Sequence, residues 1–343
     1  MRIERKILTR KQILLGRYSA QFWVLAAFLA LVFLIGGGSR NDIQSLVILR
    51  PASILVFAFG LWTLSREHLN AYRWVFGMAA AIMILTALHL VPLPPAMWEA
   101  LSGRGLLVEI DHAAGIGGVW RPLAMVPTGA WNAFFSLFAP LSVLVLGVQL
   151  DADERFRFLP LLLGIGLLSG SIGLLQILGA PDGPLYFYRV TNEGSAVGLF
   201  ANRNHAAVFL ACLFPLLAIF GWVNAETIER RRFRSWMSGI LGGFILMLIL
   251  VTGSRAGVVV AALGLVSVPL LYQPPQITLP ARRKGAPRTK FTFIYGAFGI
   301  VALGVLTALF SRAEALKRLT APDQLDDRRF QIWGPTLDAI WKY

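Results

Sequence analysis

Four consecutive polar residues interrupt an apolar run in the middle of the chain, in the sequence GLFANRNH at residues 198–205. Lipid does not tolerate such residues, so they indicate the entrance of a helix at the water interface. Hydrogen-bond donors at a helix N-terminus lie beside the positive end of the helix dipole, where an anionic phosphate is stabilised. In the alternative interpretation Asn202 caps the helix and Arg203 reaches the interface. A cap needs only one polar residue, which favours a binding role for Arg203.

A second arginine lies in the sequence TGSRAG, residues 252–257, a predicted tight turn between two long apolar runs. Counting the runs places Arg255 on the same side of the membrane as Arg203. Each planar guanidinium group can hold a phosphate through two parallel hydrogen bonds, so the pair suits a pyrophosphate. The alternative is a turn made by glycine that carries one interfacial arginine.

A third group of cations, Arg328 and Arg329, precedes an amphipathic pattern near the end of the sequence. Its apolar stripe is formed by Ile332, Trp333, Leu337, Ile340 and Trp341. The pattern predicts a helix that lies along the membrane surface. Arg329 would add a cation to the site, although a solvated charge cluster explains the same residues. Arg50, which stands before Pro51 in an apolar run, is expected to extend to the interface, with a role in a groove as the alternative.

The remaining polar candidates carry weaker signals. The isolated histidines are His89 and His112, and the carboxylates with no partner visible in the sequence are Glu109, Asp111 and Glu193. Neither an HExxH spacing nor a Walker loop is present in the sequence. We therefore expect no metal site and no ATP hydrolysis.

The elements that must position these motifs are membrane helices. The chain has 343 residues, of which 56% are hydrophobic and 15% charged, against about 45–50% and about 25% in soluble domains. Runs long enough to cross a bilayer, which needs about 20 residues, occur near 20–38, 43–64, 74–91, 131–150, 158–178, 201–223, 237–253, 256–272 and 291–311. The predicted fold is an all-α integral membrane protein with about nine transmembrane helices. Cys212 lies inside a run, which leaves no disulfide framework and no cysteine metal site.

The distribution of lysine and arginine predicts the orientation. Residues 1–19 form a basic segment that we place in the cytoplasm, because most basic residues of the short loops then fall on that side. The short basic connections are SREHLNAYR, DADERFR, ETIERRRFRS and QPPQITLPARRKGAPRTK. The transmembrane domain is expected over 20–311, with outer loops near 92–130 and 179–200, and 312–343 would begin a large periplasmic loop. Despite a net charge of +14, the basic residues are not clustered on a soluble surface, so no nucleic-acid partner is expected.

The motifs, in this order, resemble the O-antigen ligase and O-antigen polymerase superfamily of bacterial inner-membrane glycosyltransferases. The resemblance rests on residues 200–205, the turn at 254–257, and Arg329 with Trp333. The sequence WRPL at 120–123 also looks like the early outer loop of that family. The similarity covers about residues 90–343, and its most specific part is the first motif.

The resemblance implies a membrane-embedded fold of the GT-C type and a glycan donor carried on undecaprenyl diphosphate. The residues implied to bind the diphosphate are Arg203, Arg255, Arg329, Asn202, Asn204 and His205. The arginines would replace the metal of other glycosyltransferases, and no cofactor is implied. The acceptor would be the lipid A core, a lipid-linked glycan or a protein, on the periplasmic face of the inner membrane, with membrane lipid as a further partner.

One departure from the family concerns the catalytic base. Family members continue into a large outer loop containing a histidine implicated as that base, whereas no histidine follows His205 here. We therefore expect the chain to be truncated at its C-terminal end, with the catalytic residue unassigned. His205 is a candidate substitute, although its position favours binding.

Two other functions are compatible with the same residues. Arginines in a membrane protein often line a substrate pathway, so a transporter or flippase for a lipid-linked sugar or another anion is the alternative. Transporters commonly bind substrate near the membrane midplane, whereas these arginines gather at one face. A non-catalytic membrane scaffold would explain the helices but not the polar motif.

Overall fold

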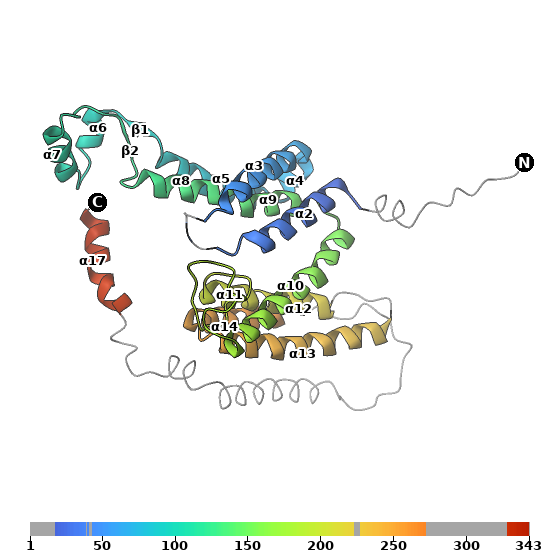
Figure 1. The fold of residues 1–343 in the computed structure, drawn as a ribbon. Helices are drawn as coiled ribbons and strands as arrows, with labels where there is room; N and C mark the ends of the chain where they lie inside the picture. The colour runs from blue at the N-terminus through green and yellow to red at the C-terminus, as the bar shows by residue number, and fades with distance from the viewer. Residues whose placement is uncertain (1–17, 39, 41–42, 223–226, 272–327, 343) are drawn as a thin grey trace, which may run out of the picture. The chain divides into compact units, whose positions relative to one another are not determined.

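The computed structural model describes residues 18–38, 40, 43–222, 227–271 and 328–342 (Figure 1). Most of them are helical, and the strands among them form one two-stranded sheet. The chain divides into two compact units. Unit 1 is built mainly from residues 150–271 and unit 2 mainly from residues 46–149, and each is described by itself.

Eight of the nine predicted apolar runs coincide with a helix or with two consecutive helices. Among the described residues, five segments are long and apolar enough to cross a membrane: α3 (Leu46–Thr63), α8 with α9 (Pro127–Gly147), α10 (Ala152–Leu178), α11 with α12 (Arg203–Trp222) and α13 (Ile228–Val251). Shorter apolar helices are α2 (Ala20–Ile35), α5 (Arg73–Leu88) and α14 (Arg255–Leu270). The prediction of a helical protein with several possible membrane spans is confirmed. The count of nine stays a prediction, and the run at 291–311 lies outside the described residues, as do 1–17 and the loop at 273–290.

Two of the predicted basic connections are helical, which corrects the sequence interpretation. DADERFR forms the start of α10, where Asp151 Oδ1 accepts a hydrogen bond from Glu154 N at 2.7 Å in a capping box. ETIERRRFRS, from residue 227 onward, forms the cap and start of α13, where Thr227 Oγ1 accepts from Arg230 N at 3.2 Å. The caps satisfy backbone N–H groups outside the apolar segment, so each helix extends into its charged flank.

A third connection, SREHLNAYR, also contains a helix. Its residues form α4 (Arg66–Ala71), which begins after the N-cap residue Ser65. This connection too is more regular than the loop expected from the sequence.

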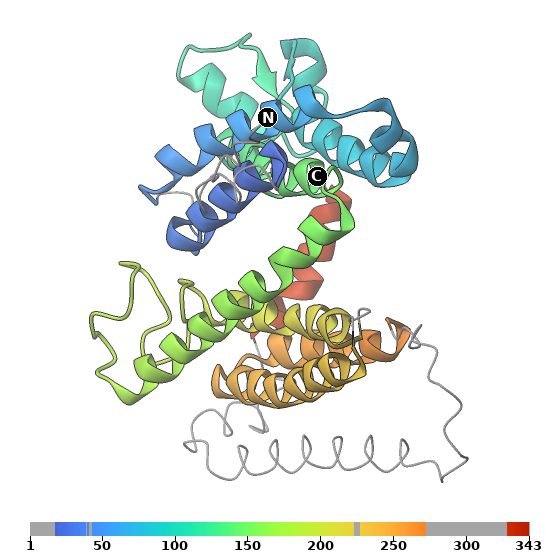
Figure 2. The ribbon, with the colours of Figure 1, turned by 90° about the vertical axis from the view of Figure 1, so that its right-hand side faces the viewer.

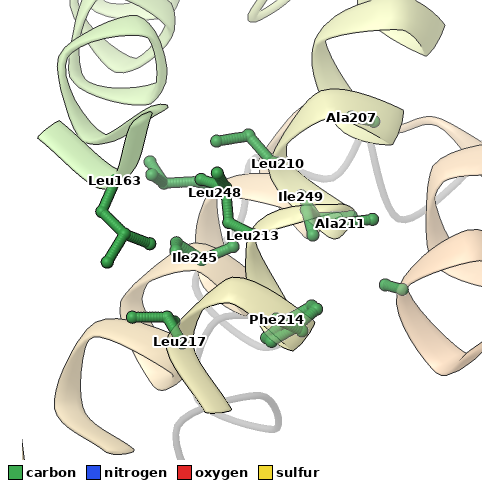
Figure 3. Close-up of a cluster of buried hydrophobic side chains, with 11 residues drawn as sticks. Leu163, Ala207, Leu210, Ala211, Leu213, Phe214, Leu217, Ile245, Leu248 and Ile249 are labelled. Carbon is green, nitrogen blue, oxygen red and sulfur yellow. The ribbon is translucent and has the colours of Figure 1, made fainter. Parts of the chain in front are cut away.

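Unit 1 packs α10, α11 (Arg203–Ala211), α12 (Leu213–Trp222), α13 and α14 around one apolar cluster (Figures 1 and 2). Figure 3 shows leucines and isoleucines from α10 to α13 converging. Two glycines of α10 make room for this contact. A Cβ atom on Gly166 would lie 2.2 Å from Leu213 Cδ1, and one on Gly170 would lie 2.3 Å from Leu248 Cδ1. Since lipid tails are as apolar as leucine, such close packing rather than burial from water holds membrane helices together.

Unit 2 contains α3 to α9, with α6 (Pro95–Glu99), α7 (Gly105–Ala113), α8 (Pro127–Ser136) and α9 (Phe138–Gly147). Strands β1 (Pro92–Leu93) and β2 (Arg121–Pro122) pair antiparallel, which joins the two ends of the segment between α5 and α8. Polar groups connect α3 to α9. Ser142 Oγ donates to Ser53 O at 2.8 Å, and Gln149 Nε2 donates to Gly60 O at 2.9 Å.

Arg50 has a partner inside unit 2. Its Nη2 group, on α3, donates a hydrogen bond to Asn132 Oδ1 on α8. The sequence predicted that this arginine extends to the interface. The structure instead pairs it with an amide from a neighbouring apolar helix, as is usual for an ionisable group in such a segment.

The amphipathic pattern near the end of the sequence forms α17 (Arg328–Lys342), as predicted. Its apolar side chains, from Ile332 to Trp341, are exposed. Membrane-surface binding of this helix stays a prediction, and residues 312–327 lie outside the described residues.

Candidate functional site

The N-termini of α11 and α14 are joined by a hydrogen bond between side chains. Ser254 Oγ donates to Asn204 Oδ1 at 2.7 Å, across a separation of 50 residues. Asn204 follows Arg203, and Ser254 precedes Arg255, so each arginine is the first residue of one of two joined helices. The structure therefore brings together the two motifs that the sequence marked separately.

Small residues allow α11 and α14 to approach closely. A Cβ atom on Gly257 would lie 2.3 Å from Ala207 Cβ, and one on Gly264 would lie 2.9 Å from Ala211 O. Gly257 and Gly264 are two turns apart on α14, and Ala207 and Ala211 are one turn apart on α11. This is the small-residue packing that brings membrane helices into backbone contact, and it places the two helices side by side.

The turn at 252–254 has the conformation that its glycine permits. Gly253 has a φ of +63°, in the left-handed region, and links the end of α13 at Val251 to the start of α14. Ser254, which is 1% exposed, caps α14 by accepting from Gly257 N at 3.0 Å. The tight turn is thus confirmed, and Ser254 serves as both cap and link.

Asn202 caps α11, as the alternative interpretation of the motif expected. Its Oδ1 accepts from Asn204 N at 2.8 Å, while Asn192 Oδ1 accepts from Arg203 N at 3.0 Å. These bonds use the first backbone N–H groups of the helix. An anion at this site would therefore be held mainly by side-chain donors and by the field of the helix dipoles.

A buried glutamine organises the segment that leads into α11. Gln176 on α10 is 2% exposed. Its Nε2 donates to Leu185 O at 2.8 Å and Gly198 O at 3.0 Å, and its Oε1 accepts from Val197 N at 3.0 Å and Gly198 N at 2.8 Å. All four hydrogen-bonding positions of one amide thus hold the loop against α10.

Ser169 and Gly198 complete this support. Ser169 Oγ accepts from Leu199 N at 3.1 Å. Gly198 has a φ of +59°, and a Cβ atom there would lie 2.3 Å from Ser169 O. Sequence reasoning missed Ser169 and Gln176, although two polar residues seven positions apart in an apolar run mark one face of a helix.

Further hydrogen bonds hold the segment that precedes α11. Ala201 N donates to Gly37 O at 2.9 Å, and Tyr186 Oη donates to Ser195 O at 3.2 Å. Burial raises the pKa of Tyr186, and the nearby Glu193 carboxylate raises it further, against a lowering by a backbone hydrogen bond with Gly194. Burial also raises the pKa of Tyr188. Both phenols are therefore favoured in their neutral form.

The exposed surface of the site is cationic. Arg203 is half-buried, whereas Arg255 and His205 are exposed. Arg203 and Arg255 therefore stand at two joined helix ends, each of which is the positive end of a helix dipole.

No protein-family model matches this sequence, and neither the curated proteins nor the solved structures contain a significant match. The interpretation of the site therefore rests on its residues and their geometry.

The structure also describes several of the other sequence candidates. Arg329 belongs to α17 in unit 2, and its side chain is outside what the structure describes. Asp111, for which the sequence showed no partner, forms a 2.5 Å ion pair with Arg121. The negative charge of Glu193 raises the pKa of Tyr186. In the described ranges there is no group of three or more histidine, cysteine or acidic side chains that could hold a metal ion.

Proposed function

We propose that the chain belongs to a membrane glycosyltransferase of the O-antigen ligase and polymerase type. It would transfer a glycan from undecaprenyl diphosphate to a lipid A core, a lipid-linked glycan or a protein on the periplasmic face of the inner membrane. The observation that carries this proposal is the hydrogen bond from Ser254 Oγ to Asn204 Oδ1. It links the ends of the two helices that begin with Arg203 and Arg255, which supports a shared role for these arginines.

In this reaction the acceptor hydroxyl oxygen bonds to the anomeric carbon of the donor sugar as the bond from that carbon to the diphosphate oxygen breaks. Negative charge develops on the departing diphosphate. Arg203 and Arg255 would stabilise that charge more strongly in the transition state than in the bound donor, which accelerates the reaction. The rigid packing of α11 on α14 would keep both guanidinium groups in position as the charge appears.

The proton of the acceptor hydroxyl must pass to a base. His205, exposed in the first turn of α11, is the candidate within the motif. Its position next to Asn204 also suits a hydrogen bond to the glycan donor. Substitution of His205 separates these two roles. Loss of a base would change the pH dependence of transfer, whereas loss of a binding contact would raise KM.

The test uses the full-length protein in proteoliposomes with an undecaprenyl-diphosphate-linked glycan and an acceptor. Arg203→Ala and Arg255→Ala are each expected to lower transfer about 100- to 1000-fold, the usual effect of removing a donor to a developing anion. Lysine at either position should rescue poorly, because an ammonium group cannot form two parallel hydrogen bonds with a phosphate. Arg189→Ala, an exposed arginine of the neighbouring loop, is the matched control.

Two results would count against the proposal. Unchanged transfer in both alanine variants at equal expression would remove the diphosphate role of the arginines. Movement of the donor across sealed vesicles without any glycosidic product would instead identify a transporter.

A further inference from the structure

The segment between α5 and α8 in unit 2 contains a second cationic cluster, which the proposed transfer reaction does not use. Its centre is Trp98 on α6, which is 3% exposed and donates from Nε1 to Pro122 O at 3.1 Å. Two guanidinium groups lie over its ring: Arg104 Cζ is 5.1 Å and Arg121 Cζ 5.4 Å from the ring centroid. One indole ring therefore contacts two cations.

The partners of the two arginines are incomplete. Arg104, which is only 6% exposed, donates from Nη2 to Leu123 O at 2.6 Å, but its Nε and Nη1 atoms are buried without a hydrogen-bond partner. Arg121 Nη2 bonds to Asp111, and its Nε is also buried without a partner. Four buried N–H groups are thus without a partner. Three belong to Arg104, one on Nε and two on Nη1, and the fourth is on Nε of Arg121.

The charges of the cluster are also unbalanced. Asp111 pairs with Arg121, and no ion pair of Arg104 with a carboxylate occurs among the described residues. One positive charge of the cluster therefore has no carboxylate. A buried, unpaired charge is unfavourable unless an anion or polar group completes its contacts.

The connectivity places the cluster close in sequence to a helical segment that is able to cross a membrane. Strand β1 begins at Pro92, four residues after α5 ends at Leu88, and α8 begins at Pro127, five residues after β2 ends at Pro122. The segment α8 with α9 is one of the helices able to cross a membrane. If this segment crosses a phospholipid bilayer, lipid phosphate groups lie at either of its ends, so phosphate is a suitable anion to consider.

We propose that the cluster of Trp98, Arg104 and Arg121 is a binding site for a phosphate group, from a membrane phospholipid or from free phosphate. Arg121, whose side chain is 32% exposed, is its accessible member, and Arg104 is the buried member with unsatisfied donors. The oxygens of one phosphate accept hydrogen bonds from several N–H groups at once and balance the extra charge.

The test uses detergent-purified, delipidated full chain and follows its thermal unfolding midpoint. Separate titrations use inorganic phosphate and short-chain phosphatidylglycerol, with sodium chloride at matched ionic strength. At least one phosphate compound should raise the midpoint, while chloride should not. A response to both identifies the phosphate group as the ligand, and a response to phosphatidylglycerol alone identifies the lipid as its source.

The variants separate recognition from folding. Arg104→Lys retains the positive charge but loses the planar set of donors, so its apparent affinity is expected to fall at least about tenfold. Arg66→Lys, an exposed arginine of α4 in the same unit, should behave as wild type. Equal phosphate responses in wild type and Arg104→Lys, or no response to either probe, would overturn the proposal. Neither result bears on Arg203 and Arg255.

Discussion

Ser254 Oγ donates a hydrogen bond of 2.7 Å to Asn204 Oδ1, and the same oxygen accepts one from Gly257 N. A single buried hydroxyl group thus caps α14 and joins it to α11. Because Arg203 and Arg255 are the immediate neighbours of these two residues, the spacing of the cations depends on this hydroxyl. The site is therefore sensitive to a residue that would not itself contact substrate.

Ser254→Ala is expected to lower both stability and glycan transfer. Loss of the cap costs about 1 kcal/mol, and the lost side-chain link about 1 kcal/mol more, so the unfolding midpoint should fall. The arginines remain, so transfer should weaken less than in Arg255→Ala. The control is Ser267→Ala, whose hydroxyl bonds only to Gly264 O within α14 among the contacts described. Wild-type midpoint and transfer in Ser254→Ala would show that the link is not needed.

Gly257→Ala should destabilise the protein by about 1–3 kcal/mol, the usual cost of overpacking. The added Cβ would lie 2.3 Å from Ala207 Cβ, which forces α14 away from α11. Gly239→Ala on α13 is the matched control, because a Cβ there meets nothing within 4 Å. Gly239→Ala lowers the backbone entropy of the unfolded chain, so it should stabilise the folded protein by about 0.5–1 kcal/mol.

Thermal unfolding in detergent measures both glycine variants. Combining Gly257→Ala with Ala207→Gly should restore much of the midpoint, because it moves the methyl group across the interface. Equal shifts in Gly257→Ala and Gly239→Ala would contradict the close approach of the two helices.

The helices were predictable from the sequence because a run of about 20 apolar residues matches the length of helix that crosses a bilayer. The starts of α10 and α13 were not, since they depend on the caps at Asp151 and Thr227 within charged stretches that read as loops. The arginine motifs were recognisable because four polar residues rarely occur together at an apolar helix end. Their joining depends on Ser254 and Asn204, whose pairing is a tertiary contact.

The support of the site was less predictable for the same reason. Gln176 and Ser169 are visible as polar residues on one helix face, but nothing local shows that the backbone at 197–199 returns to them. Similarly, Asp111 could not be paired with Arg121 until the strand pairing of Leu93 with Arg121 closed the segment. Local patterns predict elements, whereas these contacts depend on which distant segments meet.

Tyr186 should make stability fall in alkaline solution. Its pKa is raised above the ordinary value of 10.0 in the folded protein, chiefly by burial. Above that pH the unfolded chain loses the phenolic proton first. The contribution of Tyr186 to the free energy of unfolding is therefore fully present below pH 10.0 and is lost as the pH rises toward the folded pKa. Tyr186→Phe should therefore show a smaller loss of unfolding midpoint between about pH 8 and about pH 10.5.

The charge of Glu193 provides an independent check on this residue. Since Glu193 raises the pKa of Tyr186, Glu193→Gln should let the phenol ionise at lower pH. The difference in tyrosinate absorbance between each protein and its Tyr186→Phe version isolates this one group. An unchanged titration in Glu193→Gln would show that the carboxylate does not act on the phenol.

Gln176→Leu should release the loop that leads into α11. The change leaves Val197 N, Gly198 N and Gly198 O without their partner in a buried setting, at about 1–3 kcal/mol for each group left unsatisfied. We expect residues 179–200 to become sensitive to added protease, and transfer to fall because Asn192 no longer holds Arg203 N. Gln176→Glu keeps the acceptor but loses the Nε2 donor and buries a carboxylate opposite two carbonyl oxygens, so it should also release the loop at neutral pH. Leu175→Ala, at an exposed position of the same turn, is the control for a general weakening of α10. Equal proteolysis of Leu175→Ala and Gln176→Leu would show that the glutamine has no special role.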